Sequence, residues 1–160
     1  MFIHTNGMAS PMKKAFAIMM LILPMLAVGQ SQAQSNSPET MTPITITAGG
    51  KVFHAKLHDN EAASALLKQM PLTLKMSDLN RNEKYYKLEK SLPAPTTEKP
   101  STIKAGELMV WSGDTLVLFY KTFSNSYGGY VRLGYVEDAS SLANALGSGD
   151  AQVSFHVVAR

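Results

Sequence analysis

The chain has 160 residues, with 15 Lys and Arg against 12 Asp and Glu, and a net charge of +3. This length suits one domain, and the absence of cysteine excludes disulfides, thiolate metal sites and thiol nucleophiles. With 45% hydrophobic and 17% charged residues, the composition is that of a globular chain and not of a disordered one.

The N-terminal segment has the pattern of a secretory signal peptide. Two lysines precede the apolar run 15–28, which is shorter than the roughly 20 residues that a membrane-spanning helix needs. Small residues then place cleavage after Ala33, with the segment 27–29 as a second option. An uncleaved anchor or a buried helix are the alternatives. We expect residues 1–33 to be the signal peptide and the mature protein to be periplasmic or secreted, with membrane contact only through the leader before cleavage.

Most of the net positive charge belongs to this leader, because it contains two lysines and no acidic residue. So small a remaining excess makes nucleic acid a poor candidate partner. Residues 34–42, which are mostly polar, predict a flexible linker. We expect residues 43–160 to form the folded domain.

Two alternating segments open this domain. Residues 44–47 and 52–58 flank the turn Gly49–Gly50 and predict a β-hairpin. Phe53, Ala55 and Leu57 share one face of its second strand.

A short helix is expected next, with Asp59 or Asn60 as its N-cap and Pro71 as its stop. Further strands are expected over 72–76 and, after a turn, over 83–88.

The second half of the domain is richer in strands. Residues 91–102 contain three prolines and predict a loop. Residues 108–111 and 115–121 predict a hairpin whose strands are apolar on both faces, which is typical of strands packed inside and covered outside. Further strands are expected over 130–136 and 152–157, with a second short helix between them that Asp138 caps and Gly147 ends.

These elements predict an all-β fold, a small closed β-barrel of about eight mainly antiparallel strands with two short helices. Six blocks, in order, resemble the bacterial cyclophilin-like family, whose members are small and often exported proteins. The blocks are Leu57–Ala63, Leu72–Leu74, Asn82–Tyr86, Ile103–Gly106, Leu116–Phe123 and Leu146–Asp150. The resemblance covers residues 44–158 and implies a closed barrel of about eight strands capped by two helices. It implies no settled activity.

True cyclophilins are peptidyl-prolyl isomerases with a catalytic Arg in a Phe-His-Arg-Val signature and a Gln-Gly-Gly-Asp segment. The nearest match here is the segment 53–56, Phe-His-Ala-Lys, which lacks that Arg, and there is no Gln-Gly-Gly-Asp. The isomerase residues therefore have no counterparts at matching positions, and no catalytic residue is assigned.

Aromatic residues concentrate between Trp111 and Tyr135. Tyrosine combines an apolar ring with a polar tip and suits a partly wet groove. The alternative is barrel core for Trp111 and Phe119, with the tyrosine hydroxyls at its rim. The candidate binding groove consists of Tyr120, Phe123, Tyr127, Tyr130 and Arg132.

Arg132 lies in the middle of a predicted strand and could donate hydrogen bonds to a carbonyl or carboxylate in the groove. An ordinary outward-facing strand residue is the alternative. Convergence of Arg132 with Tyr120, Phe123 and Tyr130 would favour an isomerase.

Glu83, Lys84, Tyr85 and Tyr86 form the most specific local block of the resemblance. A Glu near a Tyr could serve as acid or base, but an ion pair and two packed aromatics holding a turn explain the block as well. Glu107 is expected to make a structural contact at the turn that follows Gly106.

No metal site or cofactor is predicted. His54 and His58 are four residues apart on a strand, about 13 Å, which is too far for one ion. Phosphate-binding loops and the Gly-x-Ser-x-Gly motif are missing.

The sequence therefore favours an exported binding module for a peptide or small-molecule ligand. A weak peptidyl-prolyl isomerase is the alternative. A structural partner of an envelope protein would instead present an exposed apolar patch.

Overall fold

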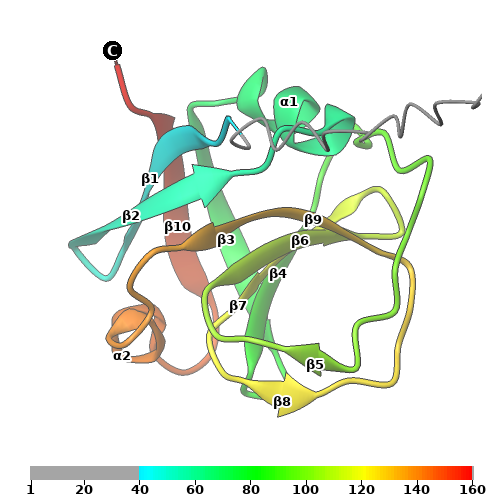
Figure 1. Ribbon diagram of the computed structural model, residues 1–160. Coiled ribbons are helices and arrows are strands. Elements are labelled where there is room, and N and C mark those ends of the chain that lie inside the picture. The colour runs from blue at the N-terminus through cyan, green and yellow to red at the C-terminus, as the bar shows by residue number, and fades with distance from the viewer. Residues whose placement is uncertain (1–39, 160) are drawn as a thin grey trace, which may run out of the picture. The chain divides into compact units, whose positions relative to one another are not determined.

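The computed structural model describes residues 40–159 (Figure 1). The predicted signal peptide and most of the predicted linker lie outside the described residues. The elements are β1 (Thr42–Ala48), β2 (Lys51–Leu57), α1 (Glu61–Leu67), β3 (Leu72–Leu79), β4 (Glu83–Lys87), β5 (Thr102–Ile103), β6 (Glu107–Trp111), β7 (Thr115–Phe119), β8 (Phe123–Ser124), β9 (Tyr130–Val136), α2 (Leu142–Leu146) and β10 (Ala151–Val157).

Eight of these strands form a closed barrel in the order β1-β10-β3-β4-β7-β6-β9-β2. Neighbouring barrel strands pair antiparallel throughout. The predicted all-β barrel with two short helices is thus confirmed. β1 begins at Thr42, one residue inside the segment expected to be a linker. β5 and β8 form a separate two-stranded sheet at the bottom of Figure 1, which no pattern in the sequence predicts.

The contact between β2 and β9 helps to close the barrel and depends on Gly134. A Cβ atom at this position would lie 2.1 Å from the carbonyl oxygen of Lys56, closer than non-bonded atoms approach, so a glycine is required. Next to it, an irregularity in the pairing of β6 with β9 leaves Leu133 outside the ladder. The Leu133 side chain is fully buried in the main core.

The barrel interior holds the main hydrophobic core. Phe53, Ala55 and Leu57 of β2 face it, as their alternation predicts. Leu116 and Leu118 of β7 also face it and are completely buried. Burial of a large apolar side chain contributes about 1.5–3 kcal/mol, so this cluster is the main source of stability.

A second, smaller core lies outside the barrel. Met109 of β6 and Val117 and Phe119 of β7 point outward and pack with Ile103 of β5 and Tyr130 of β9. The two central strands are therefore apolar on both faces for the predicted reason: they are packed inside and covered outside.

Asn60, one of the two predicted caps, begins α1. Its side-chain oxygen accepts a hydrogen bond of 2.8 Å from the backbone N–H of Ala63. For α2 the predicted cap is wrong: Ser141 occupies the N-cap position. Asp138 instead accepts a 2.9 Å hydrogen bond from the N–H of Ser140, in the turn before the helix. Gly147 ends α2 with φ +61°, as expected.

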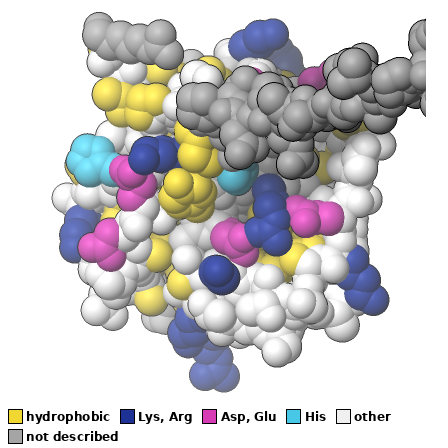
Figure 2. Space-filling model, in the orientation of Figure 1, with side chains coloured by type: hydrophobic (Ala, Val, Ile, Leu, Met, Phe, Trp, Pro, Cys, Tyr) yellow, Lys and Arg dark blue, Asp and Glu magenta, His cyan; other side chains and the backbone are white. Residues whose placement is uncertain are grey.

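The visible surface of the described residues intersperses acidic and basic side chains (Figure 2). Exposed ion pairs such as Lys56 with Glu137 contribute little to stability. Within residues 40–159, no helix is long and apolar enough to cross a membrane.

Candidate functional site

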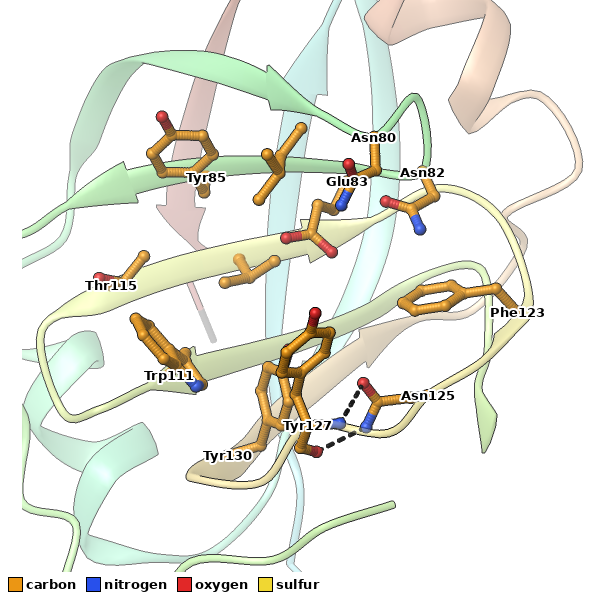
Figure 3. Close-up of a pocket in the computed structure, with 12 residues that line it drawn as sticks. Asn80, Asn82, Glu83, Tyr85, Trp111, Thr115, Phe123, Asn125, Tyr127 and Tyr130 are labelled. Carbon is orange, nitrogen blue, oxygen red and sulfur yellow. Dashed lines mark hydrogen bonds between the residues drawn. The ribbon is translucent and has the colours of Figure 1, made fainter. Parts of the chain in front are cut away.

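A pocket of about 370 Å³ opens on the outer face of the barrel, beside the second core. Its walls come from the end of β3, from β4, β6 and β7, from the start of β9, and from β8 with the loop that follows it (Figure 3). The lining residues are Leu79, Asn80, Asn82, Glu83, Tyr85, Trp111, Thr115, Val117, Phe123, Asn125, Tyr127 and Tyr130.

The deep part of the pocket is aromatic and well packed. Phe119 lies behind it, with ring centroids 5.7 Å from Phe123 and 6.0 Å from Tyr130. Tyr130 contacts Phe119 edge to face, a favourable geometry for two rings. Burial, followed by the nearby charge of Glu83 and by Tyr127, raises the pKa of Tyr130, so its hydroxyl stays protonated at neutral pH.

The mouth of the pocket is lined by large apolar groups that reach the solvent. Leu79, Trp111 and Tyr127 are 44%, 45% and 70% exposed. Isolated exposed apolar residues are ordinary, but three around one opening form a patch of the kind that binds ligands.

Asn125 fixes the loop that presents Tyr127. Its side-chain N–H₂ donates to the carbonyl oxygens of Pro100, at 2.8 Å, and Tyr127, at 2.7 Å, and its side-chain oxygen accepts from the Tyr127 N–H at 3.1 Å. The Trp111 indole N–H donates to the Gly128 carbonyl at 3.0 Å. The backbone of Tyr127 and the indole of Trp111 are thereby fixed at the mouth of the pocket.

Glu83 supplies the pocket's one ionisable carboxyl. Its side chain is only 8% exposed and extends from β4 toward the space between Phe123, Tyr127 and Tyr130 (Figure 3). Burial, with a smaller contribution from the charge of Asp78, raises its pKa to about 7. Within residues 40–159 this carboxyl has no hydrogen-bond or ion-pair partner.

Lys84 points to the opposite side of β4, into the barrel, and is fully buried. Its Nζ donates to the Asp78 carboxylate at 2.7 Å and to the carbonyl oxygens of Gly147 and Gly149. The Tyr120 hydroxyl donates to the same Asp78 oxygen at 2.6 Å. Burial opposes ionisation of Asp78, but the bonds from Lys84 and Tyr120 outweigh it and lower the pKa.

The structure brings together three of the five predicted groove residues, Phe123, Tyr127 and Tyr130. Tyr120 instead lies in the main core of the barrel, where its hydroxyl serves Asp78. The motif residues divide in the same way: Glu83 and Tyr85 line the pocket, whereas Lys84 points into the barrel and Tyr86 packs against the main core.

Arg132 lies apart from this pocket. Its Nε donates to Glu98 at 2.7 Å, and its Nη1 donates to Glu107. Glu107 also accepts a 2.7 Å hydrogen bond from the N–H of Lys104, which is the expected turn contact. Arg132 lines a second hollow, of about 490 Å³, together with Asn60, the loop 93–98 and the start of β9.

Trp111, Asn82 and Asn125 line the pocket but were not among the predicted groove residues. For Trp111 the sequence leaves both the groove and the barrel core open, and its place at the end of a hairpin strand favours partial exposure. The asparagines have no sequence feature that distinguishes them from turn residues.

No cluster of three His, Asp or Glu side chains that could hold a metal ion occurs in the described part of the chain. His54 and His58 therefore belong to no such cluster. The single carboxyl in the pocket lining supplies too few ligands for a typical metal-ion site.

Comparison with known proteins identifies the fold. A model of the Cyclophilin-like family matches residues 46–156. Among solved structures, the solution structure of the hypothetical protein AF2241 from Archaeoglobus fulgidus is similar, with a TM-score of 0.52 and 13% identity over 77% of this chain and 99% of that one. No curated protein matches significantly. Because the family match spans most of the described barrel, the chain belongs to the cyclophilin-like family.

Proposed function

We propose that the protein is a binding module that takes a peptide or small-molecule ligand in the pocket over β4, β6 and β7. The observation that carries this proposal is the aromatic mouth: Trp111 and Tyr127 remain exposed although a second core lies directly beside them. Covering such side chains with a ligand removes apolar surface from water, which favours binding.

The fixed loop supports the same proposal. Because Asn125 bonds the Tyr127 backbone and Gly128 accepts from the Trp111 indole, the loop and the Trp111 ring lose less conformational entropy when a ligand binds. A purely structural loop would gain nothing from presenting a tyrosine that is 70% exposed.

The alternative, weak prolyl isomerisation, has less support. It required an arginine that converges with the aromatic residues, and two carboxylates hold Arg132 beside the second hollow. The pocket's own charged side chain is Glu83, an acceptor, whereas isomerisation is helped by a donor aimed at the prolyl amide.

The chain offers a direct test of binding, since Trp111 is its single tryptophan and lines the pocket. Its fluorescence should respond to ligands from a peptide and fragment collection. Tyr127→Ala should remove the response, whereas Val52→Ala, an exposed apolar residue that does not line the pocket, should leave it unchanged. If no compound changes Trp111 fluorescence, or if Tyr127→Ala binds equally well, the proposal is wrong.

A prolyl isomerase assay on the protein and its Arg132→Ala variant separates the two functions. We expect no activity above the uncatalysed rate. Activity that falls with Arg132→Ala would favour the enzyme.

We also propose export, with a mature protein in the periplasm or outside the cell. The basic and apolar pattern of residues 1–33 supports it. Mass spectrometry of the exported protein should find a start near Gln34, or near Gln30 for the second cleavage site. An intact leader on soluble protein would contradict cleavage.

A further inference from the structure

Two acceptor groups in the polar lining of the pocket have no hydrogen-bond partner among the described residues. The Glu83 carboxyl has no partner within residues 40–159. The side-chain oxygen of Asn82, also in the lining, is buried and has no hydrogen-bond partner among the described residues. Buried acceptors without donors are costly, so a ligand that brings donors or positive charge would relieve this cost.

Among the described residues, the pocket lining contains a negatively charged side chain and no positively charged one. Glu83 is its only Asp, Glu, Lys or Arg among the lining residues. The nearest candidate counter-ion in sequence, Lys84, points into the barrel and is used there, and Arg132 is held by Glu98 and Glu107. A ligand cation would therefore be the natural partner of the Glu83 carboxylate.

Aromatic rings surround the same space. Trp111 and Phe123 lie on opposite sides of it, and Tyr127 and Tyr130 lie along a third side, opposite Glu83 (Figure 3). The faces of such rings attract cations, and rings around an ammonium group are a recurrent way of binding it.

The barrel interior contains a filled version of this arrangement. There the Lys84 ammonium lies 2.7 Å from the Asp78 carboxylate and 5.2 Å from the centroid of the Tyr120 ring. The outer pocket has the carboxylate and the rings without the ammonium. We propose that the pocket binds an organic cation, an ammonium or guanidinium group on an apolar stem, with Glu83 as its counter-ion.

This inference rests on the proposed binding function and narrows its ligand class. The cation could belong to a small free amine or to a lysine or arginine side chain of a peptide. Both sources share the chemistry that the pocket recognises. They differ in whether flanking backbone must fit across the mouth, beside Leu79 and Tyr127.

The first probe is choline, compared with 3,3-dimethylbutan-1-ol, its uncharged carbon isostere. Trp111 fluorescence reports occupancy for both. We expect choline to bind about tenfold more tightly, because the cation–π attraction and the coulombic attraction to the Glu83 carboxylate exist only for the charged probe. Glu83→Gln should remove most of this preference, whereas Glu89→Gln, an exposed carboxyl outside the pocket lining, should keep it.

A peptide pair distinguishes the source. An acetylated and amidated Gly-Lys-Gly tripeptide is compared with the same tripeptide in which the lysine is acetylated. Preference for the charged peptide over choline would assign the site to a basic side chain of a peptide. Preference for choline over the peptide would assign it to a free organic cation. Either result supports the inference, provided that the neutral partner binds less well.

A pH series adds a readout that a structural role for Glu83 would not produce. Choline does not titrate, so its affinity should rise between about pH 6 and about pH 8 as Glu83 loses its proton. The other titratable residues in the pocket lining are Tyr85, Tyr127 and Tyr130, and Asp78 and Tyr120 interact electrostatically with Glu83 from behind it. Burial raises the pKa of Tyr120 and of Tyr130, so both stay protonated over this range, and Asp78, whose pKa is lowered, stays charged; Glu83 is the group whose raised pKa falls within the range.

Two outcomes would overturn the inference. If the neutral isostere binds as tightly as choline, the pocket takes apolar ligands, and the proposed binding function stands without its cation. If choline binds equally well to Glu83→Gln, the counter-ion is wrong. Failure of every probe, charged and neutral, together with silence of the fragment collection, would instead remove the binding function itself.

Discussion

Glu83 and Lys84 are neighbours on β4 and face opposite sides of the barrel wall. Inside the barrel, the fully buried Lys84 donates hydrogen bonds to a carboxylate and two carbonyl oxygens, and its ammonium lies over a tyrosine ring. Outside, Glu83 has aromatic neighbours and no partner within the described residues. The difference separates two states of a buried charge: a satisfied group stabilises a fold, whereas an unsatisfied group costs stability and marks a candidate site.

The largest effect on stability should come from removing the Lys84 ammonium inside the barrel. Lys84→Met removes the ammonium that pairs with Asp78, which keeps only the neutral donors of Tyr120 and the Arg81 backbone, and it takes the Lys84 donor from the carbonyl oxygens of Gly147 and Gly149. It should lower the free energy of unfolding by about 3–5 kcal/mol. Urea unfolding measures it. Lys87→Met, on the same strand with an exposed side chain, should change stability by less than about 1 kcal/mol. Similar small losses for both variants would contradict the role of Lys84.

The charge of Glu83, on the outer side of β4, should lower the stability of the fold, whereas the charge of Lys84 raises it. The folded state raises the pKa of Glu83 from 4.5 to about 7, so between these values the unfolded chain releases the proton more readily and stability falls as pH rises. The cost is complete above about pH 8, where the folded state has also lost the proton, and is on the order of 3 kcal/mol.

Glu83→Gln should therefore match the wild type in stability near about pH 4 and exceed it by on the order of 3 kcal/mol near about pH 8. Urea unfolding across this range, without ligand, measures the difference. A difference that does not vary with pH would mean that Glu83 is solvated or paired.

A smaller loss is expected from Tyr120→Phe. This change removes the hydroxyl that donates to Asp78 but leaves the ring beside Lys84, and should cost about 1.5–2 kcal/mol. Tyr127→Phe, in the exposed mouth, serves as the matched control and should be neutral. Equal effects of the two changes would place the Tyr120 hydroxyl in solvent.

The smallest effect on stability should accompany a large effect on binding. Tyr127→Ala removes a side chain that is 70% exposed, so the free energy of unfolding should change by no more than about 0.5 kcal/mol. Thermal unfolding measures the stability of this variant, and a fluorescence titration of Trp111 measures its ligand binding. A marked loss of stability would mean that Tyr127 holds the loop and does not serve a ligand.

Much of the barrel was predictable because apolar residues alternate along its strands. The hairpin of β6 and β7 and the inward face of β2 follow directly from that alternation. β5 and β8 were not predictable as a pair, because each has two residues in a loop and their contact joins distant segments. Strands this short have no periodicity.

The site was predictable in part, and the residues that the sequence placed differently from the structure have physical reasons for the difference. Tyr120 continues the inward alternation of Leu116 and Leu118, so its burial in the core followed from a pattern that its aromatic neighbours obscured. The partners of Arg132 come from β6 and from the loop before β5, and no local pattern predicts that pairing. Glu83 stood out only as part of a motif, since the sequence does not state which side of β4 each residue faces.

The most direct test of this account is the pKa of the Glu83 carboxyl, measured by a ¹³C NMR titration of the unliganded protein. The account predicts a value near 7, well above the ordinary 4.5, and a fall in that value when choline is added, because a bound cation favours the carboxylate. A value near 4.5 that choline does not change would contradict it, since Glu83 would then be solvated and the outer pocket would lack its unpartnered charge.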